Sequence, residues 1–488
     1  MKHFLDIARG AYSHLPPLTR SHVSRFLRLI PEDLKWGSTY REWRQLLASA
    51  KTNPSLLSKR QHLARLAVVT TAAERSPFYR ALFEEVFGSK FESVQWLDDA
   101  NWAQIPILTS ASVVERARDM CTRPLSELDI GSTGGTSGNP VKFYLDKHRS
   151  PIEYAFVHDA WARAGFRPGD PRCVFRGLEL SGSREPHMEY DPALAELRCS
   201  VFHLNDANML GYYREILARH IHFIHGYPSA IAGFASFLLR TGLAPLKQIK
   251  GVFPTSERFN ADHCAIVAGA FERATIVPFY GLSEKVAFAC ARPDDLEAFE
   301  FNPLYGYTEL LDENGSAVTT PGDTGRIIST GLLFHGMPFI RYETGDSARL
   351  VELPAERNGY RLTVRDVSPK HGIEYLLGRS GILIALKGII SNLQGTAYGI
   401  REYQFFQDTP GEAVVRVVPL SWAAADFSAY EDLLNRKMAG ELCVKVDVVD
   451  HVTITPRGKR RLVVQRLDLT QLMNQIKFHT ETSEERRV

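Results

Sequence analysis

The sequence predicts an α/β protein: a large N-terminal domain with mostly parallel, helix-covered sheets plus an antiparallel subdomain, and a small α+β C-terminal domain. Three observations lead to this prediction. Apolar, strand-like segments alternate with helical segments between residues 150 and 282. Short alternating segments joined by turn residues follow residue 305. A break in composition near residue 378 precedes one more strand, helix and strand.

At 488 residues, 44% hydrophobic and 23% charged, the chain has the composition of a globular protein with two or three domains. Its 58 basic and 56 acidic residues leave a formal charge of +2, which gives no field that would recruit nucleic acid or an anionic membrane. The six cysteines form no C-x-x-C pair, and no segment reaches about 18 uninterrupted apolar residues. We therefore expect a cytoplasmic protein with reduced thiols, no membrane span and no nucleic-acid partner.

Residues 1–125 are expected to form the helical N-terminal part of the large domain. Residues 61–69 carry apolar side chains at helical spacing, Pro77 marks a break before a helix over 81–87, and a further helix begins near Ser112. This region offers packing positions and no residue pattern that points to chemistry.

Helices and strands alternate in the prediction for residues 150–282, which favours a mostly parallel sheet covered by helices. Ligands bind at the carboxyl ends of the strands in such sheets, and Tyr280 and Gly281 are expected at such an end. The predicted helices span 151–164, 212–220, 228–240 and 261–271, and the predicted strands span 173–176, 222–225, 249–254 and 275–280.

Beyond residue 305 the pattern becomes antiparallel, with short strands predicted over 307–311, 325–330 and 339–342. The break near residue 378 separates the core of the large domain, 126–378, from a small domain over 379–470. Residues 471–488 are polar and are predicted to be a frayed tail. The small domain is expected to contain strands over 413–419 and 444–449 and a helix over 430–438.

A loop rich in glycine lies at residues 131–140, directly before a strand predicted over 141–145. It holds four glycines and four hydroxyl residues, so it exposes backbone N–H groups and hydroxyls with little steric shielding. Such a loop suits a phosphate chain, although neither the G-x-x-x-x-G-K-[ST] nor the G-x-G-x-x-G spacing is present. A flexible glycine-serine connector is the alternative interpretation.

Four further stretches lie in order along the chain with this loop. Together the five motifs resemble those of the adenylate-forming (ANL) superfamily, and more narrowly those of the phenylacetate-CoA ligase family and its branch found with capsular polysaccharide biosynthesis. The resemblance covers residues from about 55 to 465. The four stretches are Tyr-Gly-Leu-Ser-Glu at 280–284, Arg-Tyr-Glu-Thr-Gly-Asp at 341–346, Gly-Arg-Ser at 378–380 and Gly-Lys-Arg-Arg at 458–461.

The resemblance implies that ATP is a substrate, that residues 126–378 are the nucleotide- and substrate-binding core, and that the small C-terminal domain is mobile. It assigns Glu284 to Mg²⁺ and to catalysis, and Lys459 to the charge on the α-phosphate, with Arg460 as a competitor for that role. Thr133 is also expected to be catalytic. The phosphates would be held by Ser132, Thr133, Gly134, Gly135, Thr136, Ser137 and Gly138.

The remaining nucleotide contacts also follow from the resemblance. Tyr280 is expected to stack on adenine, and Asp346 and Arg379 are expected to reach the ribose. Taken alone, each has a structural alternative: a core aromatic, a turn aspartate and an interdomain salt bridge. The other residues expected to bind the nucleotide are Ser256, Glu257, Gly281 and Ser283.

The chain departs from its relatives at two places. Relatives carry aspartates after Gly-Arg-Ser, where this chain has Gly381, and this puts the usual hinge contacts in doubt. Many relatives also have a cysteine and histidine pair that binds zinc, whereas this chain keeps Cys290 but has Phe301 and Asn302 where the histidine is expected. We expect no structural zinc. His222 and His225 are expected on opposite faces of a strand, where they would not share a metal.

The expected activity is that of an AMP-forming carboxylate ligase, which adenylates an aryl or apolar organic acid with ATP and passes the acyl group to coenzyme A. One alternative is an amide- or ester-forming synthetase whose acceptor is an amine or hydroxyl of an amino acid or sugar. Another alternative is a ligase-like scaffold without catalysis.

Overall fold

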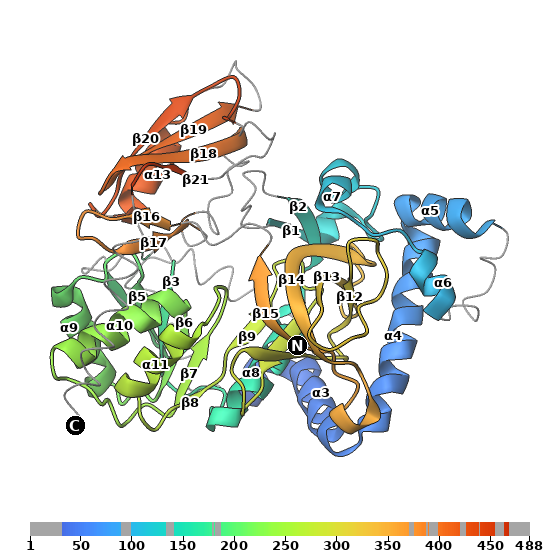
Figure 1. Cartoon of the computed structure of the whole chain (residues 1–488), viewed down its shortest axis with the longest axis horizontal. Coiled ribbons are helices and arrows are strands. Elements are labelled where there is room, and N and C mark those ends of the chain that lie inside the picture. The colour runs from blue at the N-terminus through green and yellow to red at the C-terminus, as the bar shows by residue number, and fades with distance from the viewer. Residues whose placement is uncertain are drawn as a thin grey trace. The chain divides into compact units, whose positions relative to one another are not determined.

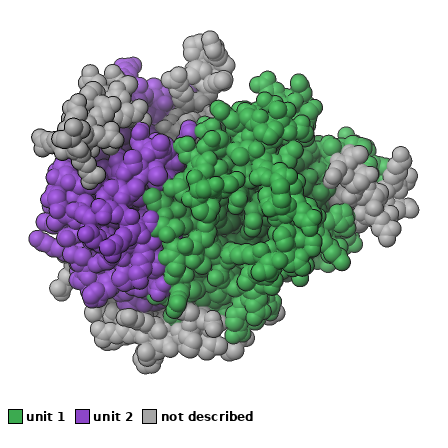
Figure 2. Space-filling model, turned by 60° about the horizontal axis from the view of Figure 1, so that its bottom comes forward, with its two compact units in different colours: residues 1–133, 141–169, 275–372 green, residues 134–140, 170–274, 373–488 purple. Residues whose placement is uncertain are grey.

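The computed structural model describes residues 32–88, 99–132, 141–177, 180, 187–369, 375–386, 389, 399–419, 426–438, 440–453 and 463–467. The chain divides into two compact units, which Figure 2 shows in separate colours. Unit 1 comprises residues 1–133, 141–169 and 275–372, and unit 2 comprises residues 134–140, 170–274 and 373–488. The domain boundaries expected at 125, 378 and 470 remain predictions.

The N-terminal part of unit 1 is helical over its described residues, as expected. The predicted break at Pro77 is real, but the helix after it begins at Pro77 itself and not at residue 81. Proline suits the first turn of a helix, and the Ser76 hydroxyl caps that turn by accepting the Tyr79 N–H at 3.3 Å. The helices of unit 1 are α3 (Glu32–Thr52), α4 (Pro54–Arg75), α5 (Pro77–Phe87), α6 (Asp99–Gln104), α7 (Ser110–Arg116) and α8 (Ser150–Trp161), with 3₁₀ turns at η3 (Leu125–Glu127), η4 (Ala162–Ala164) and η5 (Glu356–Asn358).

A seven-stranded antiparallel sheet forms the centre of unit 1, in the order β12-β13-β14-β15-β11-β10-β9. A separate antiparallel pair joins β1 (Leu128–Ser132) to β2 (Lys142–Asp146), which confirms the strand expected after the glycine-rich loop. The strands of the large sheet are β9 (Phe279–Gly281), β10 (Phe288–Ala291), β11 (Ala298–Phe301), β12 (Gly306–Leu311), β13 (Thr324–Gly331), β14 (Tyr342–Glu352) and β15 (Thr363–Pro369).

The prediction of a single strand over 275–280 is wrong, and the difference concerns the site. The segment is split into β8 (Thr275–Ile276) and β9, because Pro278 lies between them and has no N–H to donate to a ladder. Tyr280 pairs with Ala289 in the antiparallel sheet. The expected position of Tyr280 and Gly281 at the carboxyl end of a parallel strand is therefore incorrect.

The strand predicted over 339–342 is also wrong, since β14 begins only at Tyr342. Arg341 has φ +48°, so the chain turns there before it enters the strand. Its N–H donates to Thr330 Oγ1 at 2.8 Å, which fixes the turn against β13.

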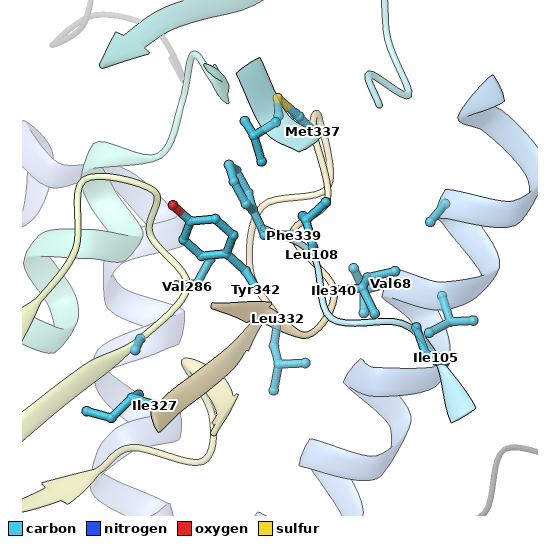
Figure 3. Packing of buried hydrophobic residues seen from close by; sticks show 14 of the residues in the cluster. Val68, Ile105, Leu108, Val286, Ile327, Leu332, Met337, Phe339, Ile340 and Tyr342 are labelled. Carbon is cyan, nitrogen blue, oxygen red and sulfur yellow. The ribbon is translucent and has the colours of Figure 1, made fainter. Parts of the chain in front are cut away.

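The core of unit 1 lies between this sheet and the N-terminal helices. Figure 3 shows Val68 from α4 and Ile105 packed near Leu108 and Ile340. In the same view the ring of Tyr342 lies beside Phe339, and its hydroxyl oxygen points away from the apolar side chains. The entry to β14 is thus held in place by apolar burial.

A buried ion pair reinforces the same position. Arg341 is only 4% exposed and pairs with Glu309 of β12 at 3.2 Å. Its guanidinium also donates to the carbonyl oxygens of Ala103 and Ile105 at 2.7 and 2.6 Å. Trp102 Nε1 donates to the same glutamate at 3.0 Å. The charge of Arg341 is therefore balanced and its N–H groups are bonded, as a buried cation requires.

Unit 2 contains the expected parallel sheet, whose strands run in the order β4-β5-β3-β6-β7. β3 pairs in parallel with β5 and with β6, β6 pairs in parallel with β7, and β4 is antiparallel to β5. Helices α9, α10 and α11 lie beside the sheet (Figure 1, green). The elements are β3 (Arg172–Arg176), β4 (Met188–Asp191), β5 (Glu196–Ser200), α9 (Asp206–Ala218), β6 (Phe223–Gly226), α10 (Pro228–Arg240), β7 (Gly251–Pro254) and α11 (Ala261–Ala270).

The C-terminal part of unit 2 is α+β, as expected, with a four-stranded sheet in the order β20-β19-β18-β21. A hairpin of β16 (Tyr375–Leu377) and β17 (Leu383–Ala385) precedes it. Its other elements are β18 (Ile400–Thr409), β19 (Glu412–Pro419), α13 (Ser428–Met438), β20 (Cys443–Val448) and β21 (Val463–Gln465). The mobility of this part stays a prediction, and the tail over 471–488 lies outside the described residues.

The α/β class with parallel and antiparallel sheets is thus confirmed. Within the described part of the chain, no helix is both long and apolar enough to cross a membrane.

We predict that Arg341→Ala lowers the free energy of unfolding by about 3–5 kcal/mol, because Glu309 would stay buried without its cation. Arg349→Ala is the control on the same strand, since Arg349 is 52% exposed and its pair with Asp366 spans 3.5 Å. That substitution should cost less than about 1 kcal/mol. Urea denaturation of both variants measures the difference, and equal costs would show that the buried pair does not support β14.

Candidate functional site

A bulge in β14 sets the direction of Asp346. Ile327 of β13 faces residues 344–346 of β14, three residues where regular pairing would place one. Gly345 adopts φ +82° there, a conformation that favours glycine. The Thr344 hydroxyl donates to the Ile327 carbonyl at 2.9 Å and accepts the Asp346 N–H at 3.2 Å. The Thr-Gly-Asp turn expected from the sequence is therefore a bulge inside a strand.

The bulge brings Asp346 to Tyr280. The Tyr280 hydroxyl donates to Asp346 Oδ2 at 2.6 Å. Burial, and then the Asp346 carboxylate, raise the pKa of Tyr280 well above its usual range, so the phenol keeps its proton. Phe301 packs edge-on against the Tyr280 ring, with 5.6 Å between the ring centroids. The ring and the carboxylate are thus held in a fixed relation by one hydrogen bond and one aromatic contact.

Glu284 lies in the same cluster. It is only 7% exposed, and its Oε1 accepts the Tyr342 hydroxyl at 2.9 Å. Burial raises the pKa of Tyr342, with Glu284 as the next cause and Asp346 as a further one. Glu284 also raises the pKa of Tyr280. Two carboxylates and two protonated phenols therefore form one polar group, called here the Tyr280 cluster: Tyr280, Glu284, Tyr342 and Asp346.

Two members of this arrangement were missed in the sequence. Tyr342 orients Glu284, and Thr344 shapes the bulge, yet neither was a predicted site residue. Their signal was present, since both belong to the motif at 341–346.

The other predicted site residues of unit 1 flank the glycine-rich loop and β9. Ser132 ends β1 and pairs with Lys142. Gly281 and Ser283 are exposed at the end of β9 and just after it. The predicted residues Thr133, Gly134, Gly135, Thr136, Ser137 and Gly138, and also Lys459, lie outside the described residues.

Two predicted residues of unit 2 follow β7. Ser256 adopts φ +72°, which turns the chain after the strand. Glu257 Oε2 accepts the Ser229 N–H at 3.1 Å, in the first turn of α10. A carboxylate at a helix N-terminus stabilises that end of the helix, so Glu257 has a structural role of its own. Burial raises the pKa of Tyr375, with Glu257 as the second cause.

Arg379, the remaining predicted residue, is exposed in the turn between β16 and β17 of unit 2. Its N–H donates to the Glu441 carbonyl at 2.8 Å. The structure thus brings Tyr280, Glu284 and Asp346 together in unit 1, whereas Ser256, Glu257 and Arg379 belong to unit 2.

The chemistry of the Tyr280 cluster suits a nucleotide and a hard cation. A carboxylate accepts hydrogen bonds and donates none, so the Asp346 side chain is chemically suited to the hydroxyls of a ribose. The described residues contain no group of three His, Cys, Asp or Glu side chains that could hold a metal. Mg²⁺ is commonly bound by one or two carboxylates together with phosphate oxygens and water, and Glu284 fits that pattern.

A buried histidine near the end of β6 was predicted only as a strand residue. His225 is 7% exposed, and its Nδ1 lies 3.0 Å from the Phe253 carbonyl oxygen. Burial, and then the nearby Arg176 guanidinium, lower the pKa of His225 to about 3. Nδ1 faces an acceptor, so it carries the proton of the neutral ring. His222 lies outside β6 and faces the Gln248 carbonyl oxygen at 2.9 Å.

The fold has counterparts among solved structures. A solved structure of 2-hydroxyisobutyryl-CoA ligase, in complex with 2-HIB-AMP and CoA in the thioesterification state, matches 87% of this chain and 92% of that chain. The TM-score is 0.51 and the sequence identity 18%. The same ligase in its postadenylation state with R3-HIB-AMP gives a TM-score of 0.49, also with 18% identity and the same coverage. The first of these two matches shows that the chain shares the fold of 2-hydroxyisobutyryl-CoA ligase.

Among individual proteins, the chain is similar to protein CapK of Staphylococcus aureus. The two are 20% identical over 383 residues, which cover 75% of this chain and 81% of CapK. No family model matches the chain.

We predict that His225 makes stability fall in acid. Its folded pKa of about 3 lies below the ordinary histidine value of 6.5, so the unfolded chain binds more protons between these values. The stabilisation is complete above pH 6.5 and is lost as the pH falls toward 3. His225→Asn, whose amide keeps a donor, should lose less melting temperature between pH 7.5 and pH 5 than the wild type.

The control is His220→Asn, because His220 is exposed and has φ +51°, which asparagine tolerates. This variant should keep the full pH dependence of the wild type. An unchanged pH dependence in His225→Asn would contradict the assignment.

Proposed function

We propose that this chain is an AMP-forming carboxylate ligase that adenylates an organic acid with ATP and passes the acyl group to coenzyme A. One observation carries the proposal: the hydrogen bond of 2.6 Å between Tyr280 and Asp346, with Glu284 in the same cluster. These three residues come from two separate motifs of the adenylate-forming pattern, and within unit 1 they meet.

In this proposal the Tyr280 cluster binds the nucleoside. The Tyr280 ring stacks on adenine, since an aromatic face suits a purine. Asp346 accepts hydrogen bonds from the ribose hydroxyls while Tyr280 holds its carboxylate in place. Gly281 has no side chain and Ser283 a small one, so they leave the edge of the proposed adenine site open. Ser256 and Glu257, which belong to unit 2, are also proposed to bind the nucleotide.

Glu284 is the residue that would hold Mg²⁺, which supplies positive charge next to the phosphates. The Tyr342 hydroxyl, 2.9 Å from Glu284 Oε1, fixes the direction of the carboxylate before any ligand binds. A fixed carboxylate loses less freedom on binding than a mobile one, which favours binding.

The first half-reaction joins two anions, so it depends on donors and cations. A carboxylate oxygen of the acid attacks the α-phosphorus of ATP, the bond to the bridging oxygen breaks, and pyrophosphate leaves. Ser132, Thr133 and the glycine-rich residues up to Gly138 donate to the departing phosphates. Lys459 neutralises the developing charge at the α-phosphate, and Arg379 reaches the ribose.

The second half-reaction transfers the acyl group. The thiol of coenzyme A attacks the acyl carbon and AMP leaves. The CoA named with the similar ligase structure supports this acceptor. A second candidate is an amide- or ester-forming synthetase with an amine or hydroxyl acceptor, in keeping with the resemblance of the motifs to the branch found with capsular polysaccharide biosynthesis.

The acid is proposed to be aryl or apolar, and the protein to work in the cytoplasm. A non-catalytic scaffold would not need a carboxylate that is oriented by a buried phenol, as Glu284 is by Tyr342.

Pyrophosphate release from ATP and Mg²⁺ tests the proposal, with a panel of aryl, alkyl and amino acids, each with and without coenzyme A. We expect release that depends on one acid. It should collapse in Lys459→Ala, and Asp346→Asn should raise the KM for ATP about tenfold or more, since a charged acceptor is lost. Asp366→Asn is the control, because Asp366 lies on the neighbouring strand β15.

Acceleration by coenzyme A supports the thioester, and acceleration by an amine or sugar instead supports the second candidate. Tight ATP binding without turnover for any acid would favour the scaffold. Failure to bind ATP at all would refute the assignment of the Tyr280 cluster.

A further inference from the structure

The turn that carries Arg379 is held by residues far away in the sequence. It spans residues 378–381 between β16 and β17 and is closed by a bond of 3.0 Å from the Gly381 N–H to the Gly378 carbonyl. Gly381 has φ +84°, and a Cβ placed there would meet no atom within 4 Å. Gly381 therefore shapes the turn through its backbone and makes no side-chain contact that could hold the turn in place.

Glu441, just before β20, stabilises the turn through hydrogen bonds. Its carbonyl oxygen accepts the Arg379 N–H at 2.8 Å. Its carboxylate oxygen Oε2 accepts the Ser380 N–H at 3.1 Å and the Ser380 hydroxyl at 2.9 Å. One residue thus binds three consecutive donors of the turn, two of them through a charged acceptor, which gives stronger hydrogen bonds than a neutral one.

Two glycines allow this close approach. A Cβ on Gly378 would lie 2.8 Å from Glu441 Oε2, closer than real Cβ atoms come. A Cβ on Gly411, which lies in the turn between β18 and β19, would lie 2.8 Å from Arg379 Cβ and 3.0 Å from its Cα. The backbone of the Arg379 turn therefore packs directly on two segments of the α+β part.

Strand β16 is fixed to the same part. The side chain of Gln407 in β18 is 1% exposed and bonds both backbone groups of Leu377: its Oε1 accepts the N–H at 2.7 Å and its Nε2 donates to the carbonyl at 2.8 Å. The Gly411 N–H donates to the same carbonyl at 2.9 Å. The hairpin and the α+β part are thus joined from Leu377 through Ser380.

We infer that Glu441 is a positioning residue for Arg379. This inference rests on the proposed function, in which Arg379 contacts the ribose. The bonds from Gln407, Gly411 and Glu441 fix the hairpin to the α+β part, so that part determines where the Arg379 turn lies.

The test compares Glu441→Ala with Glu441→Gln, which keeps an acceptor oxygen for Ser380. Glu412→Ala is the matched control, since Glu412 is an exposed carboxylate in the same sheet. Amide hydrogen exchange of the free full-length protein measures how strongly Glu441 stabilises the turn, and this measurement does not require catalysis. We expect the Ser380 amide to exchange about three- to tenfold faster in Glu441→Ala, and close to the wild-type rate in Glu441→Gln and Glu412→Ala.

With the acid that supports turnover, Glu441→Ala should raise the KM for ATP by about three- to tenfold at a nearly unchanged kcat. In Glu441→Gln the KM should lie close to the wild-type value. Unchanged exchange at Ser380 in Glu441→Ala would overturn the inference. So would faster exchange with an unchanged KM in an active enzyme. A wild type that lacks turnover would refute the proposed function, and the exchange rates would still decide whether Glu441 holds the turn.

Discussion

Residues 344–346 of β14 face the single residue Ile327 of β13, and the Tyr280 cluster depends on this bulge. In a regular strand, side chains alternate between the two faces of the sheet. The bulge at Gly345 breaks this alternation, and the Thr344 hydroxyl fixes the new geometry with two hydrogen bonds. Asp346 then meets Tyr280, which lies on the edge strand β9, four places from β14 in the strand order β14-β15-β11-β10-β9.

The motif at 341–346 divides into a structural and a chemical half. Arg341 is buried against Glu309 and turns the chain into β14, while Tyr342 lies in the apolar core (Figure 3). The far end of the motif carries Asp346. Tyr342 links the halves, because its ring belongs to the core and its hydroxyl orients Glu284. The rigidity of the cluster is therefore supplied by burial around it, as pre-organised sites require.

The sequence predicted the class of the fold and several elements closely. Helix α10 has the predicted bounds because Pro228 marks its first turn and its apolar residues recur at helical spacing. The sequence prediction misplaced Tyr280, because residues 275–280 resemble one continuous strand although Pro278 divides them into β8 and β9. The bulge was missed for a different reason: Thr-Gly-Asp is equally typical of a turn, and only the pairing partner Ile327 distinguishes the two.

Contacts across long sequence separations were beyond prediction. Glu441 holds a turn 61 residues away, and no local pattern marks it. No local pattern marks Gln407 either. Its side-chain amide bonds the backbone N–H and carbonyl of Leu377, as the backbone of a neighbouring strand would. The loop residues from Thr133 to Gly138, and Lys459, remain predictions from their motifs.

The Tyr280 cluster is proposed to serve chemistry at the α-phosphate of ATP. Product analysis tests this directly: ATP labelled at the α-phosphate is incubated with Mg²⁺ and the acid panel, and the products are separated by chromatography. We expect the label in AMP, and under single-turnover conditions without an acceptor in an acid-linked adenylate. Label that appears in ADP would place the chemistry at the γ-phosphate and contradict the proposed function.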